Sequence, residues 1–124
     1  MSRVCILICA LACLLAAPAG ASPGPFTYRA VVSKFGVLNR HGGGAVSAEM
    51  ASRGQYVVGF ASDIDACTIV ATLGRATTDG GQVEKPGFIS AAPVAVNSNF
   101  VSVYTSDMRG RPRDYAFHVL VACP

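Results

Sequence analysis

Two neighbouring runs of sequence decide the fold: Gly54-Gln55-Tyr56-Val57-Val58-Gly59-Phe60-Ala61 and, after a short polar link, Cys67-Thr68-Ile69-Val70-Ala71-Thr72-Leu73-Gly74. In the first run, every second residue from Tyr56 to Phe60 is large and apolar. In the second run, Cys67 shares its side with Ile69 and Leu73. Alternation with a period of two is typical of half-buried β-strands. The two runs therefore predict two adjacent strands whose apolar sides face a core.

Further short runs with the character of strands lie on both sides of this pair. They cover 26–32, 37–38, 45–50, 88–91, 94–96, 100–105 and 115–123, with turns or loops expected at 41–44, 74–81, 97–99 and 106–114. No stretch of about ten or more residues shows the periodicity of a helix. Seven or eight short strands separated by Gly- and Pro-rich turns predict an all-β fold, a small antiparallel β-sandwich. A small β-barrel is the alternative.

The N-terminus has the features of a secretory signal peptide. Arg3 precedes an apolar run from Val4 to Ala17, and Ala19-Gly20-Ala21 matches the small-residue pattern at which signal peptidase cuts. The run is shorter than the roughly 20 residues that a membrane span needs. The alternative is lipid anchoring at Cys13, because Ala10-Leu11-Ala12-Cys13 loosely resembles a bacterial lipobox, but the apolar run continues past this cysteine. We expect cleavage after Ala21 and a secreted or periplasmic protein.

Removal of residues 1–21 leaves enough chain for one domain. We expect an extended leader over 22–27 and a single β-sandwich domain over 28–124. Only Cys67 and Cys123 remain as cysteines in this mature chain. Two cysteines in a small exported domain predict one disulfide, since export delivers the chain to an oxidising compartment. Apolar alternation places both cysteines on the core side of their strands, which agrees with that pairing.

The charge of the chain is mildly basic. Loss of Arg3 with the signal peptide leaves nine Lys and Arg against seven Asp and Glu. Nucleic-acid-binding domains usually show a much stronger basic patch, so we expect no nucleic-acid partner. The sequence identifies no partner; a cell-surface polymer and another exported protein are the two candidates, and we expect no stable membrane span after cleavage.

No set of residues predicts catalysis or metal binding. His41 and His118 are the only histidines, and alternation places His118 on the exposed side of the last strand. A Ser-His-Asp triad is recognised by geometry, which a sequence does not supply. Asp63-Ile64-Asp65 offers too few oxygen ligands for calcium, which takes six to eight, so these aspartates are expected to stabilise a turn. We expect no catalytic residue, no metal and no cofactor.

The candidate ligand-binding residues are arginines in one loop and a histidine beside glycines. Arg109, Arg111 and Arg113 share the predicted loop 106–114 with two aspartates. This pattern fits a charged hairpin tip in solvent, and it also fits a contact with an anionic polymer. His41 precedes three glycines, so it is either a solvated loop residue or part of a binding loop.

Four motifs together resemble small secreted, largely uncharacterised bacterial β-sandwich modules, some of them terminal modules of fibre-like or surface proteins. The motifs are Gly54-x-Tyr56-x-Val58-x-Phe60, Cys67 leading into Ala71-Thr72-Leu73-Gly74, Val101-x-Val103-x-Thr105, and Phe117-His118-Val119-x-Val121-x-Cys123. The resemblance implies the fold, export and the Cys67–Cys123 pair, and it carries over no catalytic residue. We expect a non-enzymatic structural or interaction module. The alternatives are a lectin-like or anionic-polymer-binding module that uses its end loops and, third, a small hydrolase or inhibitor.

Overall fold

The computed structural model describes residues 26–77 and 85–124, and these residues form eight β-strands without a helix. The strands are β1 (Phe26–Val32), β2 (Leu38–Gly42), β3 (Ala45–Ser52), β4 (Gln55–Phe60), β5 (Thr68–Leu73), β6 (Gly87–Val94), β7 (Asn97–Asp107) and β8 (Phe117–Cys123). Within this part of the chain, no helix has the length and apolarity to cross a membrane. The predicted signal peptide, the alternative anchor at Cys13, the leader as far as Pro25 and residues 78–81 of the predicted loop 74–81 lie outside the described residues.

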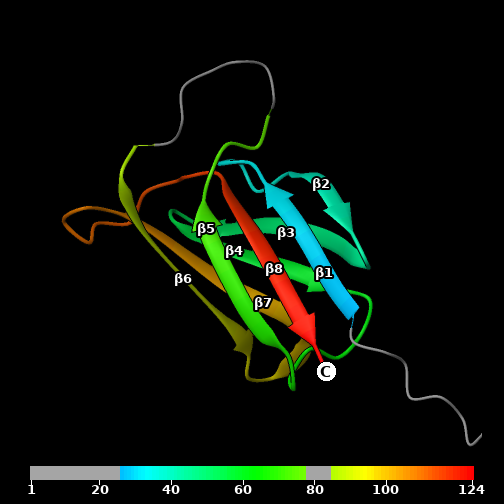
Figure 1. Ribbon diagram of the computed structural model, residues 1–124. Helices are drawn as coiled ribbons and strands as arrows, with labels where there is room; N and C mark the ends of the chain where they lie inside the picture. Colours follow the sequence, from blue (N-terminus) through cyan, green and yellow to red (C-terminus); the bar gives the residue numbers. More distant parts are fainter. Residues whose placement is uncertain (1–25, 78–84) are drawn as a thin grey trace, which may run out of the picture.

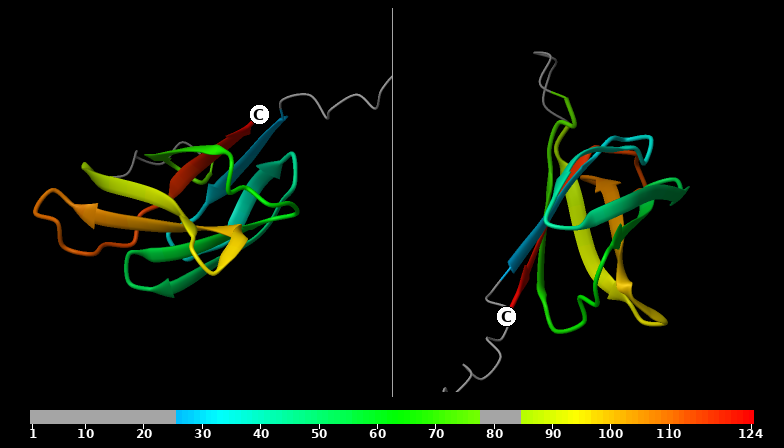
Figure 2. Two further views of the ribbon diagram at one scale, coloured as in Figure 1. Left: turned by 90° about the horizontal axis from the view of Figure 1, so that it is seen from below. Right: turned by 90° about the vertical axis from the view of Figure 1, so that its right-hand side faces the viewer.

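The strands form two four-stranded antiparallel sheets that pack face to face. One sheet has the order β2-β1-β8-β5 and the other the order β3-β4-β7-β6 (Figure 1). The right-hand view of Figure 2 shows the sheet with β1 and β8 and the sheet with β6 and β7 as separate layers. The predicted small antiparallel β-sandwich is therefore confirmed, with the higher of the two predicted strand numbers.

The prediction that β4 and β5 are adjacent is wrong, because the two strands belong to different sheets. Residues 61–67 cross from one sheet to the other instead of making a tight hairpin. Ile64 in this link is fully buried, and its N–H donates to the carbonyl of Ser98 at the start of β7. Burial of this one side chain draws the link across the end of the sandwich, where it closes the core.

The core lies between the sheets and consists of the alternating residues that the sequence indicates. Tyr56 and Val58 of β4 and Phe117 and Val119 of β8 are buried. The rings of Tyr56 and Phe117 meet edge to face with their centroids 5.0 Å apart, a geometry that favours aromatic pairs. The contact joins the two sheets, since β4 and β8 belong to different layers.

A disulfide joins Cys67 and Cys123, as predicted. Cys67 directly precedes β5, Cys123 ends β8, and these two strands pair antiparallel with Thr68 opposite Ala122. The bond therefore fastens the beginning of an edge strand to the end of the strand with which it pairs. A disulfide is compatible with an extracellular or periplasmic location.

Several predicted boundaries shift by a few residues. The sheet begins at Phe26, two residues before the predicted domain start, and β2 includes His41 and Gly42, which were predicted to lie in a loop. The predicted turn at 97–99 is wrong, because these residues open β7, and Asn97 pairs with Val94 at the end of β6. The register shifts after Pro93, which moves the turn back to residues 95–96. Pro93 is tolerated because β6 is an edge strand.

Successive connections alternate between the two ends of the sandwich because each strand runs antiparallel to the one before it. The β1–β2 loop (33–37), the β3–β4 turn (53–54), the described parts of the β5–β6 connection (74–77 and 85–86) and the β7–β8 loop (108–116) lie at one end, the upper end in Figure 1. The other three connections and the disulfide lie at the opposite end. Every second connection therefore lies at the same end of the sandwich, although these connections are far apart in sequence.

Candidate anion-binding cleft

An open cleft of about 820 Å³ lies at the upper end of the sandwich. Its lining residues are Lys34, Phe35, Arg53, Lys85, Pro86, Asp107, Met108, Arg109, Arg111, Arg113, Asp114 and Tyr115. Six of these twelve side chains are Lys or Arg and two are Asp. The whole chain has ten Lys and Arg, so most of its positive charge faces this one cleft.

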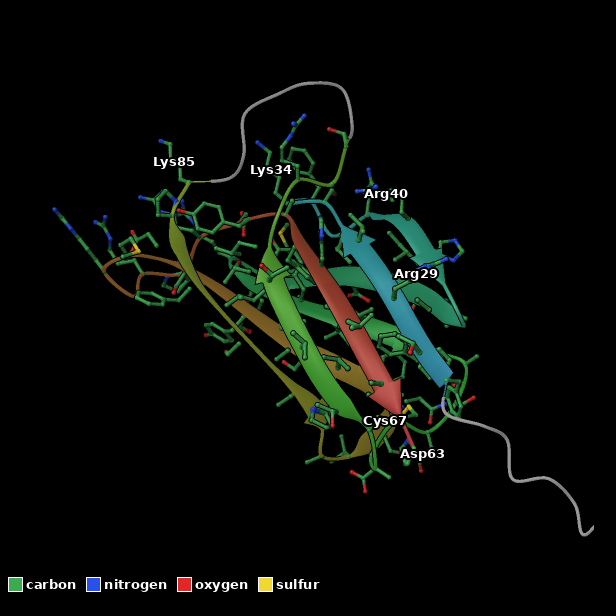
Figure 3. The ribbon with its side chains drawn as sticks, viewed as in Figure 1. Arg29, Lys34, Arg40, Asp63, Cys67 and Lys85 are labelled. Atoms are coloured by element: carbon green, nitrogen blue, oxygen red, sulfur yellow. A yellow bond between two sulfur atoms is a disulfide. The ribbon has the colours of Figure 1, made fainter. Side chains whose placement is uncertain are left out.

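All four connections at this end contribute to the positive charge. Lys34 comes from the β1–β2 loop, Arg53 from the β3–β4 turn and Lys85 from the β5–β6 connection, while the three remaining arginines come from the β7–β8 loop. Figure 3 shows Lys34 and Lys85 at the end of the sandwich opposite Asp63 and Cys67. We call Lys34, Arg53, Lys85, Arg109, Arg111 and Arg113 together the basic end.

Asp107 organises the β7–β8 loop. Its Oδ1 accepts hydrogen bonds from the backbone N–H groups of Arg109 (2.9 Å) and Arg111 (3.0 Å), and its Oδ2 lies 2.8 Å from Nε of Arg111 and 3.7 Å from Nε of Arg113. Desolvation raises the pKa of Asp107, but the hydrogen bonds from Arg111 and Arg109 and the charge of Arg111 outweigh it. The net pKa of Asp107 is therefore lowered, and the ionised carboxylate holds the three arginines in a tight turn.

Gly54 fastens the β3–β4 turn to the same loop. Its N–H donates to Oδ1 of Asp114 at 2.7 Å, and its carbonyl accepts from the N–H of Thr105 at 2.8 Å. The φ angle of Gly54 is +70°, and a Cβ at this position would lie 2.5 Å from the carbonyl oxygen of Thr105. The buried hydroxyl of Thr105 donates to the carbonyl of Arg113. These contacts hold Arg53, the neighbour of Gly54, next to the β7–β8 loop.

Tyr56 supports the β1–β2 loop from below. This core residue of β4 donates its hydroxyl hydrogen bond to the carbonyl of Lys34 at 2.8 Å. The loop is tightened further by Ser33, whose Oγ accepts from the N–H groups of Phe35 (3.2 Å) and Val37 (3.1 Å). The ammonium group of Lys34 lies 5.2 Å from the centroid of the Phe35 ring.

The positive charge of the cleft exceeds what its own carboxylates neutralise. Asp107 is engaged by two arginines, and Asp114 accepts the backbone N–H of Gly54. Within residues 26–77 and 85–124, the charged groups of Lys34, Arg53, Lys85 and Arg109 have no ion pair, and these side chains are exposed. The excess of positive charge favours the approach of anions to the cleft.

A second, smaller hollow of about 590 Å³ adjoins the cleft. It is lined by Ser52, Arg53, Gln55, Arg111, Pro112 and Arg113. Three arginines, Arg53, Arg111 and Arg113, line both hollows. The basic end therefore has room for more than one anionic group at a time.

The structure brings together only part of the predicted set of ligand-binding residues. Arg109, Arg111 and Arg113 line one cleft. His41 does not join them: it lies in β2 opposite Ala30, exposed on an edge strand. The predicted turn at Asp63 is confirmed, because its Oδ1 accepts the N–H of Asp65 at 2.8 Å.

His118 lies in β8 but is only half exposed. Its Nε2 lies 2.8 Å from the carbonyl oxygen of Arg75, so this nitrogen carries the donated proton. The ring covers Gly74, where a Cβ would come within 3.0 Å of it. The contact is with a backbone carbonyl and not with the Ser or Asp that a hydrolase would need. In the described part of the chain, no group of three or more His, Cys, Asp and Glu side chains is arranged to hold a metal ion.

Sequence reasoning missed Lys34, Arg53 and Lys85 as members of the site. Each lies in a different connection with no other cation close to it in sequence, so no local motif marks it. The signal that would have found them is positional: they fall in every second connection of an antiparallel chain, and such connections lie at one end.

No protein-family model matches this chain, and neither a curated protein nor a solved structure does. The resemblance to secreted bacterial β-sandwich modules therefore stays a prediction.

Proposed function

We propose that this protein is an exported interaction module that binds polyanionic ligands through its basic end. The observation that carries the proposal is the convergence of six cations on one cleft from four separate connections. Export is supported by the disulfide and by the signal peptide predicted at residues 1–21.

The internal contacts of the cleft favour binding of a ligand over a purely structural role for its charges. Asp107 partly neutralises Arg111 and Arg113 through ion pairs. The same carboxylate accepts the N–H of Arg109 and so stabilises the turn in which Arg109 is exposed. The remaining cations have no ion pair in the described residues, and repulsion among like charges disfavours their gathering. A ligand with several negative charges offsets that repulsion.

The ligand must engage several cations at once. A single exposed ion pair contributes only about 0–1 kcal/mol, because water screens it. The two hollows adjoin and share Arg53, Arg111 and Arg113. A ligand with repeated anionic groups can therefore contact these arginines and, at the same time, other cations of the basic end. Repeated weak contacts then add up to useful affinity.

The test compares charge reversals at two places in the same protein. R53E/R109E reverses two cations of the basic end, and the control R29E/R40E reverses two exposed arginines of β1 and β2, which lie outside the cleft. Both variants change the net charge equally. Dextran sulfate and polyphosphate serve as the anionic probes and neutral dextran as the blank, with binding followed by titration calorimetry at several salt concentrations.

R53E/R109E should weaken binding of both polyanions by about tenfold or more, because attraction becomes repulsion at two contacts. The control should stay within about twofold, and added salt should weaken wild-type binding. Equal losses in the two variants would show that net charge alone attracts the probes and would refute a defined site. Binding to neutral dextran that exceeds binding to the polyanions would favour the lectin-like alternative.

A further inference from the structure

The basic end also presents apolar side chains to solvent. Phe35 is 69% exposed and Met108 is 61% exposed, and both line the cleft. Single exposed apolar residues are common on protein surfaces and need no explanation. These two differ from the others because they sit in two different connections and are surrounded by the cations of the basic end.

Each of the two apolar side chains has a cation as its immediate neighbour. The ammonium group of Lys34 lies 5.2 Å from the centroid of the Phe35 ring, and Arg109 directly follows Met108. At a membrane surface, apolar side chains enter the boundary between headgroups and acyl chains, while Lys and Arg extend their charged groups to the phosphates. A dissolved polyanion would use the cations but would leave Phe35 and Met108 in water.

Hydrogen bonds already fix the backbone of the two segments that carry Phe35 and Met108. The N–H of Phe35 donates to Oγ of Ser33, and Tyr56 holds the carbonyl of the neighbouring Lys34. Met108 belongs to the turn that Asp107 closes, in which the N–H of Gly110 donates to the carbonyl of Asp107 at 3.0 Å. Insertion therefore costs little loss of backbone freedom, which favours binding.

We infer that the basic end docks on the surface of an anionic lipid bilayer, with Phe35 and Met108 inserted among the lipid headgroups. The inference rests on the proposed binding of polyanions and names the surface that is bound. Charge complementarity supplies long-range attraction, about fivefold in affinity for each cation near an anionic surface. Burial of each apolar side chain adds about tenfold where it is complete.

The first experiment is vesicle cosedimentation of the full mature protein. Vesicles of phosphatidylcholine containing phosphatidylglycerol are compared with vesicles of phosphatidylcholine alone. F35S/M108S removes the two apolar side chains, and F88S/V96S is the matched control, because Phe88 (55% exposed) and Val96 (94% exposed) lie outside the cleft. All four positions are exposed, so folding should be preserved, and circular dichroism checks it.

The wild type should bind the anionic vesicles and leave the neutral ones in solution. F35S/M108S should weaken vesicle binding about tenfold or more while its binding of dextran sulfate stays within about twofold. The control should behave as the wild type. Vesicle binding that F35S/M108S leaves unchanged would overturn the inference, and so would binding of dextran sulfate without any vesicle binding, an outcome that leaves the proposed function standing. Failure to bind either probe would overturn both.

A second measurement reports insertion directly. The chain contains no tryptophan, so Phe35→Trp introduces a single tryptophan reporter at the cleft, and Phe88→Trp introduces one on β6, each excited at a wavelength that the tyrosines do not absorb. Anionic vesicles should shift the emission of the residue-35 reporter to shorter wavelength and leave the residue-88 reporter unchanged. Equal responses at the two positions, or no response at position 35, would overturn the inserted geometry.

Discussion

Removal of the Cys67–Cys123 disulfide should cost a large part of the stability of this protein. The double variant C67A/C123A deletes the bond without leaving a free thiol or a buried hydroxyl. The two cysteines are 56 positions apart, so the bond closes a loop that contains β5, β6, β7 and β8. For a loop of that length, the chain-entropy relation gives about 4 kcal/mol of stabilisation.

That magnitude is large for a domain of this size. Small domains have a total free energy of unfolding of roughly 5–15 kcal/mol. Strand β5 is especially dependent on the bond, because it is an edge strand that, among the described strands, pairs only with β8. The variant should therefore fold but unfold at a much lower denaturant concentration, and β5 should be the first strand to open.

The assay is guanidinium unfolding followed by circular dichroism, on the wild type with and without reductant and on C67A/C123A. The reduced wild type and the variant should agree, and both should fall about 4 kcal/mol below the oxidised protein. Their free energies of unfolding should also decrease more steeply with denaturant concentration, because the unfolded chain without the cross-link exposes more surface. A loss below about 1 kcal/mol would refute the reasoning, since it would mean that the unfolded loop is already closed by other contacts.

Three further predictions concern the contacts that shape the cleft. Gly54→Ala forces a Cβ toward the Thr105 carbonyl at positive φ, so chemical denaturation should show a loss of about 1–3 kcal/mol; an unchanged midpoint would contradict the packing. Thr105→Val removes the hydroxyl that donates to Arg113, and thermal unfolding should show a loss of about 1–3 kcal/mol, with Thr105→Ser restoring most of it. The lowered pKa of Asp107 means that the ionised carboxylate stabilises the folded loop above its ordinary pKa and that this stabilisation is lost as the pH falls through the folded pKa. Relative to the intrinsic exchange rate at the same pH, the protection of the Arg109 and Arg111 amides should therefore fall below about pH 4 in the wild type and already be low at neutral pH in Asp107→Asn; protection that persists in both would exclude this role.

The core of the fold was predictable because it depends on a local pattern. Alternation alone places Tyr56 and Val58 of β4 and Phe117 and Val119 of β8 on buried sides, and the structure buries all four. Alternation says which side of a strand is buried but not which sheet the strand joins. For that reason β4 and β5 were predicted as neighbours, although burial of Ile64 sends the link to the other layer.

The cleft was predictable only where its residues are close in sequence. Arg109, Arg111 and Arg113 form a visible cluster, whereas Lys34, Arg53 and Lys85 join them through the topology of the chain. The structural role of Asp107 was equally hidden, because in sequence it is one of two acids flanking a basic loop, and its hydrogen bonds depend on the turn that they help to form.

The alternation of the connections has a practical consequence for handling and attaching this protein. Phe26, where the first strand begins, pairs with Cys123, where the last strand ends, so both ends of the sandwich domain emerge from the pole opposite the cleft. An affinity tag, a sensor surface or a neighbouring domain joined there would lie at the end of the sandwich opposite the basic end. Immobilisation through either terminus should leave the basic end free to meet its ligand, whereas a fusion inserted at Gly110 should block it.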